Sequence, residues 1–140
     1  MTGELLKGAP SSDVPTLLAH LRPARVPGVF VFASIQGDVP EGLTPVSTFR
    51  ETEGVSLILE EGQATRGGVT VLFRAAWITL TVRSDLQAVG LTAAVAQALT
   101  VAGISCNVVA AACHDHLFVP VERADDAVGV LQALSAAHQA

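Results

Sequence analysis

The clearest pattern of hydrophobic and polar positions lies in the second half of the chain. Over residues 77–83 apolar side chains alternate with Thr and Arg, which predicts a strand with one buried face. Ser84 and Asp85 follow, and both residue types are typical of turns and helix caps. Apolar residues then recur at helical spacing on one face: Leu91, Ala94, Val95, Ala98, Leu99 and Ala102. This pattern predicts an amphipathic helix that ends before Gly103.

A second strand, a hairpin and a second helix are predicted next. Residues 104–111 alternate, with one face made of Ile104, Cys106, Val108 and Ala110. The polar residues 113–116 are a turn, and residues 117–119 return as a strand that Pro120 ends. A second amphipathic helix follows through Ala124, Ala127, Val128, Leu131 and Leu134. This strand–helix–strand–strand–helix order lacks the last strand of a ferredoxin-like unit. That strand must come from the first half of the chain, or the sheet is shorter.

The first half of the chain is a degraded copy of the same pattern. It predicts a helix over residues 13–21, a central strand over 29–35, a hairpin within 48–59, a short helix or turn over 60–65 and a strand over 69–73. A polar turn, an apolar strand and an acidic helix start follow one another at residues 53–61 and again at 114–122, which indicates a weak internal repeat. Gly67 and Gly68 mark the boundary region, and the strand at residues 69–73 fits either half. We therefore expect an N-terminal repeat at residues 1–68 and a C-terminal repeat at residues 69–140.

Composition narrows the class of protein. A chain of 140 residues forms one domain or two very small ones that share a core, and a hydrophobic content of 50% excludes a disordered chain. The net charge is −5 and the eight basic residues are scattered. Nucleic-acid binding needs clustered positive charge, so we expect no nucleic-acid partner.

The cysteines and the apolar stretches bear on the compartment. Cys106 and Cys113 form neither a CxxC pair nor a disulfide framework, which favours reduced thiols. Residues 1–10 lack the apolar core of a signal peptide, and Gly, Thr, Gln or Ser interrupt every long apolar stretch. We therefore expect a cytoplasmic protein without membrane association.

Several runs resemble one family. They are ITLTV at residues 78–82, AVGLTA at 88–93, GISCNV at 103–108 and HDHLFVP at 114–120, with PGVFVF at 27–32 and TFRETEGV at 48–55 in the first half. They resemble the small bacterial tandem-ACT proteins, whose second repeat is similar to the ACT modules of the arginine-sensing CASTOR proteins and of aspartate kinases. The resemblance implies an α+β fold of two ferredoxin-like repeats, with antiparallel sheets, helices on one face and the option of a strand exchanged between repeats. It also implies dimerisation, and amino-acid binding at an interface between modules.

The resemblance further implies where a ligand lies. In the aspartate-kinase type, the ligand contacts the loop between the first strand and first helix, and an Asn on the second strand. The matching positions here are Ser84, Asp85, Gly90, Leu91, Thr92 and Asn107. Free N–H groups at a helix N-terminus suit a carboxylate, a glycine allows close approach, and an amide both donates and accepts. The alternative is a tight turn and an ordinary edge-strand Asn.

Glu51 and Glu53 occupy the position in the first repeat that matches the His-Asp-His turn of the second. If the ligand bears an amino group, these carboxylates are candidates to meet it between the repeats. The alternative is a solvated turn.

Catalysis and metal binding have weaker support. Residues 113–116 read Cys-His-Asp-His, a set that includes zinc ligands and a thiol beside an imidazole. Neighbouring side chains in a strand point in different directions, and no further ligand is evident. We therefore expect a hairpin turn, with no catalytic residue, metal or cofactor.

The function predicted from the sequence is regulatory binding of a small molecule, most simply an amino acid, by a homodimer. The alternative is a non-catalytic structural or protein-interaction module that binds no ligand.

Overall fold

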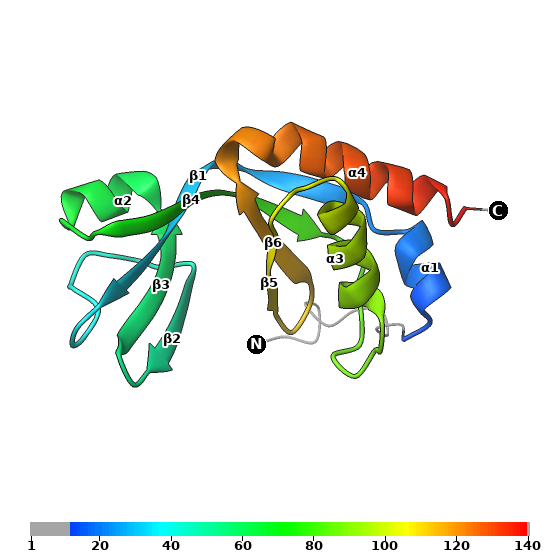
Figure 1. Ribbon diagram of the computed structural model, residues 1–140. Coiled ribbons are helices and arrows are strands. Elements are labelled where there is room, and N and C mark those ends of the chain that lie inside the picture. Colours follow the sequence, from blue (N-terminus) through cyan, green and yellow to red (C-terminus); the bar gives the residue numbers. More distant parts are fainter. Residues whose placement is uncertain (1–11, 140) are drawn as a thin grey trace.

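The computed structural model describes residues 12–139, and Figure 1 shows their arrangement. One six-stranded antiparallel sheet has the order β2-β3-β1-β4-β6-β5. The strands are β1 (Pro23–Ile35), β2 (Ser47–Glu51), β3 (Gly54–Glu60), β4 (Val71–Leu80), β5 (Asn107–Ala110) and β6 (Asp115–Pro120). The helices are α1 (Val14–Ala19), α2 (Glu61–Arg66), α3 (Leu91–Val101) and α4 (Ala124–Ala136), with a 3-10 turn, η2 (Val121–Arg123), before α4. None of the helices within residues 12–139 has the length and apolar character needed to cross a bilayer.

Strands β1 and β4 are each shared by two ferredoxin-like modules. In the C-terminal module, the second half of β4 pairs with β6 on one side and with residues 23–26 of β1 on the other. In the N-terminal module, the second half of β1 pairs with β3, and the first half of β4 closes the sheet. The strand that the C-terminal repeat lacks in sequence is therefore residues 23–26, supplied by the first half of the chain.

β4 is one continuous strand, whereas the sequence predicts separate strands at residues 69–73 and 77–83. The predicted gap falls at Ala75 and Ala76, whose small side chains weaken the alternation although both are fully buried. The strand ends at Leu80 because the next N–H groups bond outside the sheet ladder. Thr81 N–H, for example, donates to the Leu21 carbonyl at 3.1 Å.

A bulge at Gly28 divides β1 between the two modules. Val26 pairs with Trp77 and Phe30 pairs with Ala75, so three residues of β1 face a single residue of β4. Gly28 has a φ of +105°, a backbone conformation that glycine adopts without the strain of a Cβ. Because a bulge bends and twists its strand, the two halves of β1 can serve differently oriented modules.

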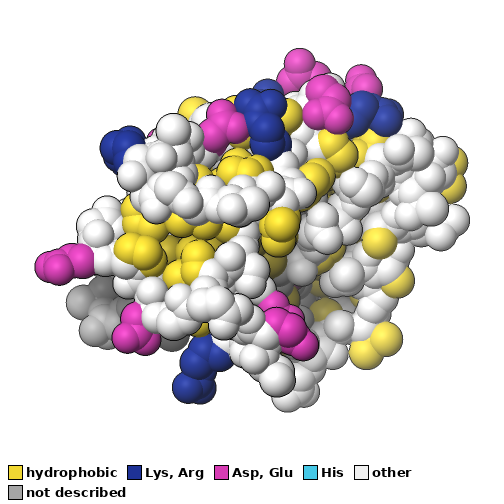
Figure 2. Space-filling view, turned by 60° about the vertical axis from the view of Figure 1, so that its left-hand side comes forward, with side chains coloured by type: hydrophobic (Ala, Val, Ile, Leu, Met, Phe, Trp, Pro, Cys, Tyr) yellow, Lys and Arg dark blue, Asp and Glu magenta, His cyan; other side chains and the backbone are white. Residues whose placement is uncertain are grey.

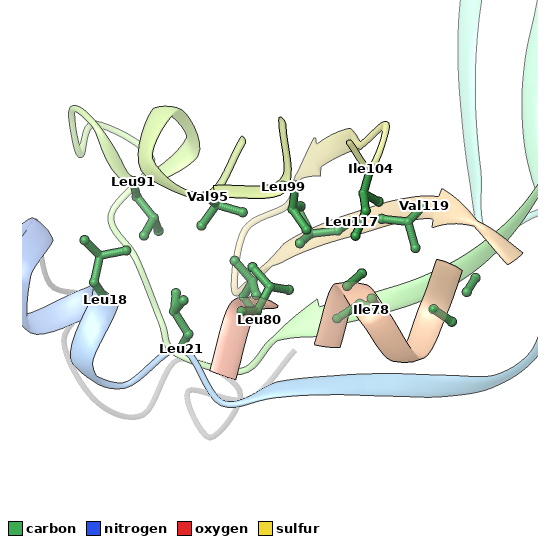
Figure 3. Packing of buried hydrophobic residues seen from close by; sticks show 14 of the residues in the cluster. Leu18, Leu21, Ile78, Leu80, Leu91, Val95, Leu99, Ile104, Leu117 and Val119 are labelled. Atoms are coloured by element: carbon green, nitrogen blue, oxygen red, sulfur yellow. The ribbon is translucent and has the colours of Figure 1, made fainter. Parts of the chain in front are cut away.

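All four helices pack on one face of the sheet, as the fold class predicts. The larger cluster joins this face of β4 and β6 to α1, α3 and α4 (Figure 3), and it includes Leu18, Leu21, Ile78, Leu80, Leu91, Val95, Leu99, Leu117 and Val119. The smaller cluster lies under α2 and comprises Val31, Ala33, Leu57, Leu59 and Ala64. Where the C-terminal module has α3, the N-terminal module has a loop of residues 36–46 whose Val39 and Leu43 pack on the smaller cluster. This missing helix is why the first repeat looks degraded in sequence.

No helix among the described residues covers the opposite face, which is rich in aromatic side chains. Phe30 meets the Trp77 ring edge-on with 5.1 Å between centroids, and Phe118 stacks on Trp77 at 5.9 Å. In Figure 1 the β2–β3 and β5–β6 hairpins hang on one side of the crossing strands β1 and β4, while α2 and α4 lie on the other. We call the sheet face that bears Phe30, Trp77 and Phe118 the helix-free face.

Hydrophobic side chains also reach the surface of the N-terminal module. The exposed ones there are Val46, Phe49, Val71 and Leu72. Figure 2, which turns this end of the molecule forward, shows hydrophobic side chains gathered in the centre with charged side chains around their margin. Contiguous apolar surface of this kind marks sites of ligand or protein contact.

Replacing Gly28 with Ala should destabilise the fold, because a Cβ is strained at its positive φ. We expect the free energy of unfolding to fall by roughly 1–3 kcal/mol. The control is Gly129→Ala in α4, where nothing lies within 4 Å of the added Cβ. That change should raise stability by up to about 1 kcal/mol. Urea unfolding, followed by the fluorescence of Trp77, the only tryptophan, measures both changes. Equal changes in the free energy of unfolding of the two variants would contradict the role assigned to the bulge.

Candidate functional site

The loop of residues 81–90 connects β4 to α3 and forms the rim of the candidate site. Asp85 organises it: its Oδ1 accepts a hydrogen bond from Gln87 N–H at 2.9 Å, and its carbonyl accepts one from Ala88 N–H at 2.9 Å. This side-chain-to-backbone turn is typical of Asp. It uses one carboxylate oxygen of Asp85 and sets the path by which the chain enters α3.

Helix α3 begins without a side-chain cap. Gly90 is the N-cap residue, with a φ of +109°, and its carbonyl accepts the hydrogen bond of Ala94 N–H at 3.0 Å. The N–H groups of Leu91 and Thr92, in the first turn, therefore have no partner within the helix. Such groups carry partial positive charge and suit a carboxylate.

Asp115 reaches the same site from the start of β6. Its side chain is buried on the helix-covered face, with the residue only 9% exposed, and its Oδ2 accepts a hydrogen bond from Ser84 Oγ at 3.2 Å. The Ser84 hydroxyl is a neutral donor, so it stabilises the carboxylate without cancelling its charge. A positively charged group of a ligand would meet that charge directly.

A cavity of about 60 Å³ joins these groups. Its lining includes Ser84, Asp85, Leu91, Thr92, Ala110 and Asp115. A carboxylate and a helix N-terminus thus border one space, an arrangement that complements the ammonium and carboxylate groups of an amino acid. The volume corresponds to only about two water molecules. A single chain therefore cannot enclose a whole amino acid, which would project from the cavity.

The structure brings together most of the predicted site residues. Ser84, Asp85, Leu91 and Thr92 line the cavity, and Gly90 lies between them in sequence at the start of α3.

Asn107 lies apart from them in the same chain. It is exposed on the edge strand β5, and its cross-strand partner is Phe118, so its side chain faces the helix-free face. It is three positions along β5 from Ala110 at the cavity, a distance of about 10 Å along a strand.

Glu51 and Glu53 lie at the turn between β2 and β3, remote from the cavity. This turn has the same place in its module as the β5–β6 turn has in the other, as the repeat predicts. Both residues are exposed. The Ser56 hydroxyl donates to the Glu51 carboxylate, and the Gln36 amide donates to the Glu53 carbonyl oxygen.

Asp115 is the site residue that sequence reasoning missed. The sequence interpretation places it in a polar turn, whereas β6 begins at Asp115. A usable signal was present, because Asp115 is in phase with Leu117 and Val119, both buried on the same face. Burying a carboxylate on the core-facing side of a strand costs free energy unless it has a partner, so this position indicated either a hydrogen-bond partner or a functional role.

The two histidines of the turn are placed differently from Asp115. The Nδ1 atom of His116 accepts a hydrogen bond from the indole Nε1–H of Trp77 at 3.0 Å, and the Thr79 hydroxyl lies 3.1 Å from it. Burial of its ring lowers the pKa of His116, the nearby His114 lowers it further, and Asp115 opposes both. His116 is therefore neutral at physiological pH.

The hypotheses of a metal site and of a cysteine nucleophile find no support within residues 12–139. No group of three or more His, Cys, Asp or Glu side chains that could hold a metal ion occurs there. Burial raises the pKa of the Cys106 thiol to about 11, so this thiol is protonated and weakly nucleophilic at neutral pH.

The lowered pKa of His116 predicts a loss of stability in mild acid. The unfolded chain, with a His pKa near 6.5, binds the proton before the folded chain does. The stabilisation is therefore complete above about pH 6.5 and declines as the pH falls toward the folded-state pKa. We expect His116→Gln to flatten this part of the stability profile, measured by urea unfolding between about pH 7 and about pH 5. An identical profile in the His116 variant would contradict the assignment.

Comparison with known proteins identifies the two modules. Models of the ACT domain match residues 9–76 and residues 73–133. No protein of curated function matches the sequence. ACT domains are generally regulatory rather than catalytic, and they are typically amino-acid-binding modules that often dimerise.

Several solved structures are also similar to this chain. A Vibrio cholerae protein of unknown function, named as a possible transport protein, is 40% identical, with a TM-score of 0.80 over 89% of this chain and 99% of its own. An Agrobacterium tumefaciens protein is 19% identical, with a TM-score of 0.66 over 81% of this chain and 87% of its own. The regulatory subunit of aspartate kinase from Thermus thermophilus, in its ligand-free form, is 12% identical, with a TM-score of 0.63 over 80% of this chain and 95% of its own. The chain thus belongs to the ACT-domain family and carries two ACT domains in tandem.

Proposed function

We propose that this protein is a non-catalytic regulatory sensor that binds an amino acid at the cavity between residues 81–90, the start of α3 and Asp115. The observation that carries the proposal is the pairing of a buried carboxylate with an uncapped helix N-terminus in one cavity. The carboxylate suits an α-ammonium group, and the free N–H groups suit an α-carboxylate. Membership of the ACT family adds support, because many ACT modules bind amino acids.

The small cavity favours a ligand held between two copies of the chain. With room for only about two water molecules, the cavity accommodates the polar end of an amino acid and leaves its side chain outside. On the loop beside this cavity, Leu86 and Val89 are large hydrophobic residues exposed to solvent. A second copy that covers them would also enclose the ligand side chain, so we propose a homodimer in a cytoplasmic setting.

Asn107 enters this proposal through the edge strand. Antiparallel pairing of β5 with the same strand of another copy would place the Asn107 end of one strand beside the Ala110 end of the other. Ala110 borders the cavity. An exposed edge strand is a ready template for such pairing. Asn107 would then lie beside the cavity of the other copy, with its side chain still on the helix-free face, so we propose that it contacts the ligand through its backbone groups.

The regulatory mechanism follows from this placement. A ligand that contacts both copies binds one arrangement of them more tightly than any other, so its binding shifts the population toward that arrangement. Glu51 and Glu53 lie on the equivalent turn of the other module. We propose them as a secondary polar contact for a ligand amino group between modules.

Exposed hydrophobic residues around the loop favour a second candidate function. Leu86 and Val89 suit contact with another protein as well as with another copy. A structural or protein-interaction module without a ligand would use the same surface.

A thermal-shift screen of the purified chain with the individual proteinogenic amino acids separates the two functions. Binding should raise the melting temperature with a saturating dependence on concentration. At about one hundred times Kd, the expected rise is roughly 5–10 °C. No rise with any amino acid would leave the interaction module as the function.

Single substitutions then test where the amino acid binds. Asp115→Asn removes the charge that the ammonium group needs, and Gly90→Val blocks the approach to the helix N-terminus. Both should abolish the shift in a protein that remains folded by circular dichroism. Asn107→Ala keeps the backbone groups proposed to contact the ligand across the interface and should retain most of the shift. The matched control is Asp38→Asn, an exposed aspartate in the other module, which should keep the full shift. A full shift in Asp115→Asn would move the site elsewhere.

A further inference from the structure

The helix-free face contains a groove that the amino-acid site does not use. It has two connected parts, which share Ser47 and Val109. The first part, about 240 Å³, lies between Ser47 at the start of β2 and Trp77, His116 and Phe118 in the C-terminal module. We call it the Trp77 pocket. The second part, about 420 Å³, continues between the hairpins. The groove is thus built from both modules and exists only because their sheets are joined.

The lining of the Trp77 pocket points to an uncharged ligand. Besides the residues above, it is formed by Val46, Val109 and Ala111, and it contains no Lys, Arg, Asp or Glu. A charged ligand there would lose hydration without gaining a partner. The aromatic walls, Trp77 and Phe118, are stacked with 5.9 Å between centroids. Flat rings gain most from such walls, in stacked or edge-on contact.

The size of the pocket suits a compound with one or two rings. An apolar cavity of about 150 Å³ is enough for benzene in another protein. The Trp77 pocket is larger, at about 240 Å³, and it adjoins the wider part of the groove, with which it shares Ser47 and Val109. Substituents on a ring can therefore extend along the groove.

His116 supplies one directional polar group. The indole Nε1–H of Trp77 is only a donor, so Nδ1 of His116 must accept, which places the ring proton on Nε2. Among residues 12–139, no hydrogen bond is made by that Nε2–H group. The side chain is half-buried and lines the pocket. The pocket thus offers one fixed donor in apolar surroundings, where an acceptor on the ligand is strongly favoured.

We propose that the Trp77 pocket is a second ligand site, which takes a small uncharged aromatic compound bearing a hydrogen-bond acceptor for His116 Nε2–H. The site is on the opposite face of the sheet from the amino-acid cavity, and it stands whether or not that cavity binds an amino acid. Because Val46 and Ser47 of one module meet Trp77 and His116 of the other across the pocket, the ligand would link the two modules and strengthen their contact.

Trp77 makes the test direct. The chain has one tryptophan, so a ¹H–¹⁵N NMR spectrum of the intact protein contains one indole N–H signal, which reports the bond to His116. Acetophenone is the probe, being uncharged and aromatic with a carbonyl acceptor. Titration should shift the indole signal with saturation. Ethylbenzene, which keeps the ring and the two-carbon chain but lacks the carbonyl acceptor, should bind about fivefold more weakly, the usual effect of one hydrogen bond. Benzoate should cause no saturable shift.

Two variants and a control locate the probe. Val109→Phe fills the pocket and should weaken acetophenone binding at least tenfold. The control, Val101→Phe, makes the same change at an exposed position on α3 and should have no effect. His116→Phe removes the donor, so acetophenone and ethylbenzene should bind this variant equally. Circular dichroism and the melting temperature establish that each variant is folded.

Three outcomes would overturn the proposal. They are an indole signal that acetophenone leaves in place up to its solubility limit, unchanged binding in folded Val109→Phe, and an indole signal that moves when the protein alone is diluted. The last outcome would assign the groove to contact between copies of the chain. If the fold of Val109→Phe is impaired, the comparison of acetophenone with ethylbenzene on His116→Phe still decides the matter.

Discussion

The antiparallel pairing of β1 with β4 is the constraint on which the rest of the structure depends. Both strands run through both modules, from the pair Ala33–Val71 at one end to Pro23–Leu80 at the other. Neither module closes its four-stranded sheet without a half-strand taken from the other. Cutting the chain at the repeat boundary would therefore expose sheet edges in both pieces. The bulge at Gly28 lets one strand bend enough to satisfy both sheets.

This shared pair also separates two chemical environments. On the helix-covered face, the end of β4 leads into the loop and the uncapped start of α3, where Asp115 and the first turn of the helix border one cavity. On the helix-free face, the two hairpins stand on either side of Trp77 and Phe118 and form an apolar groove. The proposed amino-acid cavity and the proposed Trp77 pocket thus lie on opposite sides of one sheet. Because the sheet is continuous, a ligand on either side can bias how the modules sit together.

Much of the architecture could be predicted from periodicity. The alternation at residues 77–83 and the helical spacing that ends at Gly103 correspond to the second half of β4 and to α3. The continuity of β4 could not be predicted, because Ala75 and Ala76 carry almost no alternation signal. The start of β1 was also hidden, since Pro23, Arg25 and Pro27 are unusual in a strand. Residues 23–26 form one because β4 offers an unpaired side there.

The sequence by itself determined the local elements, the repeat and the chemistry at the start of α3, because these depend on neighbouring residues. Ser84, Asp85, Gly90, Leu91 and Thr92 are near one another in the chain and remain so in the fold. Only the tertiary structure brought Asp115 to them, put Asn107 on an edge strand, and set Ser47 across a groove from Trp77. Those relations depend on strand order and register, which are fixed by long-range pairing and by how the apolar faces pack. No short stretch of sequence encodes them.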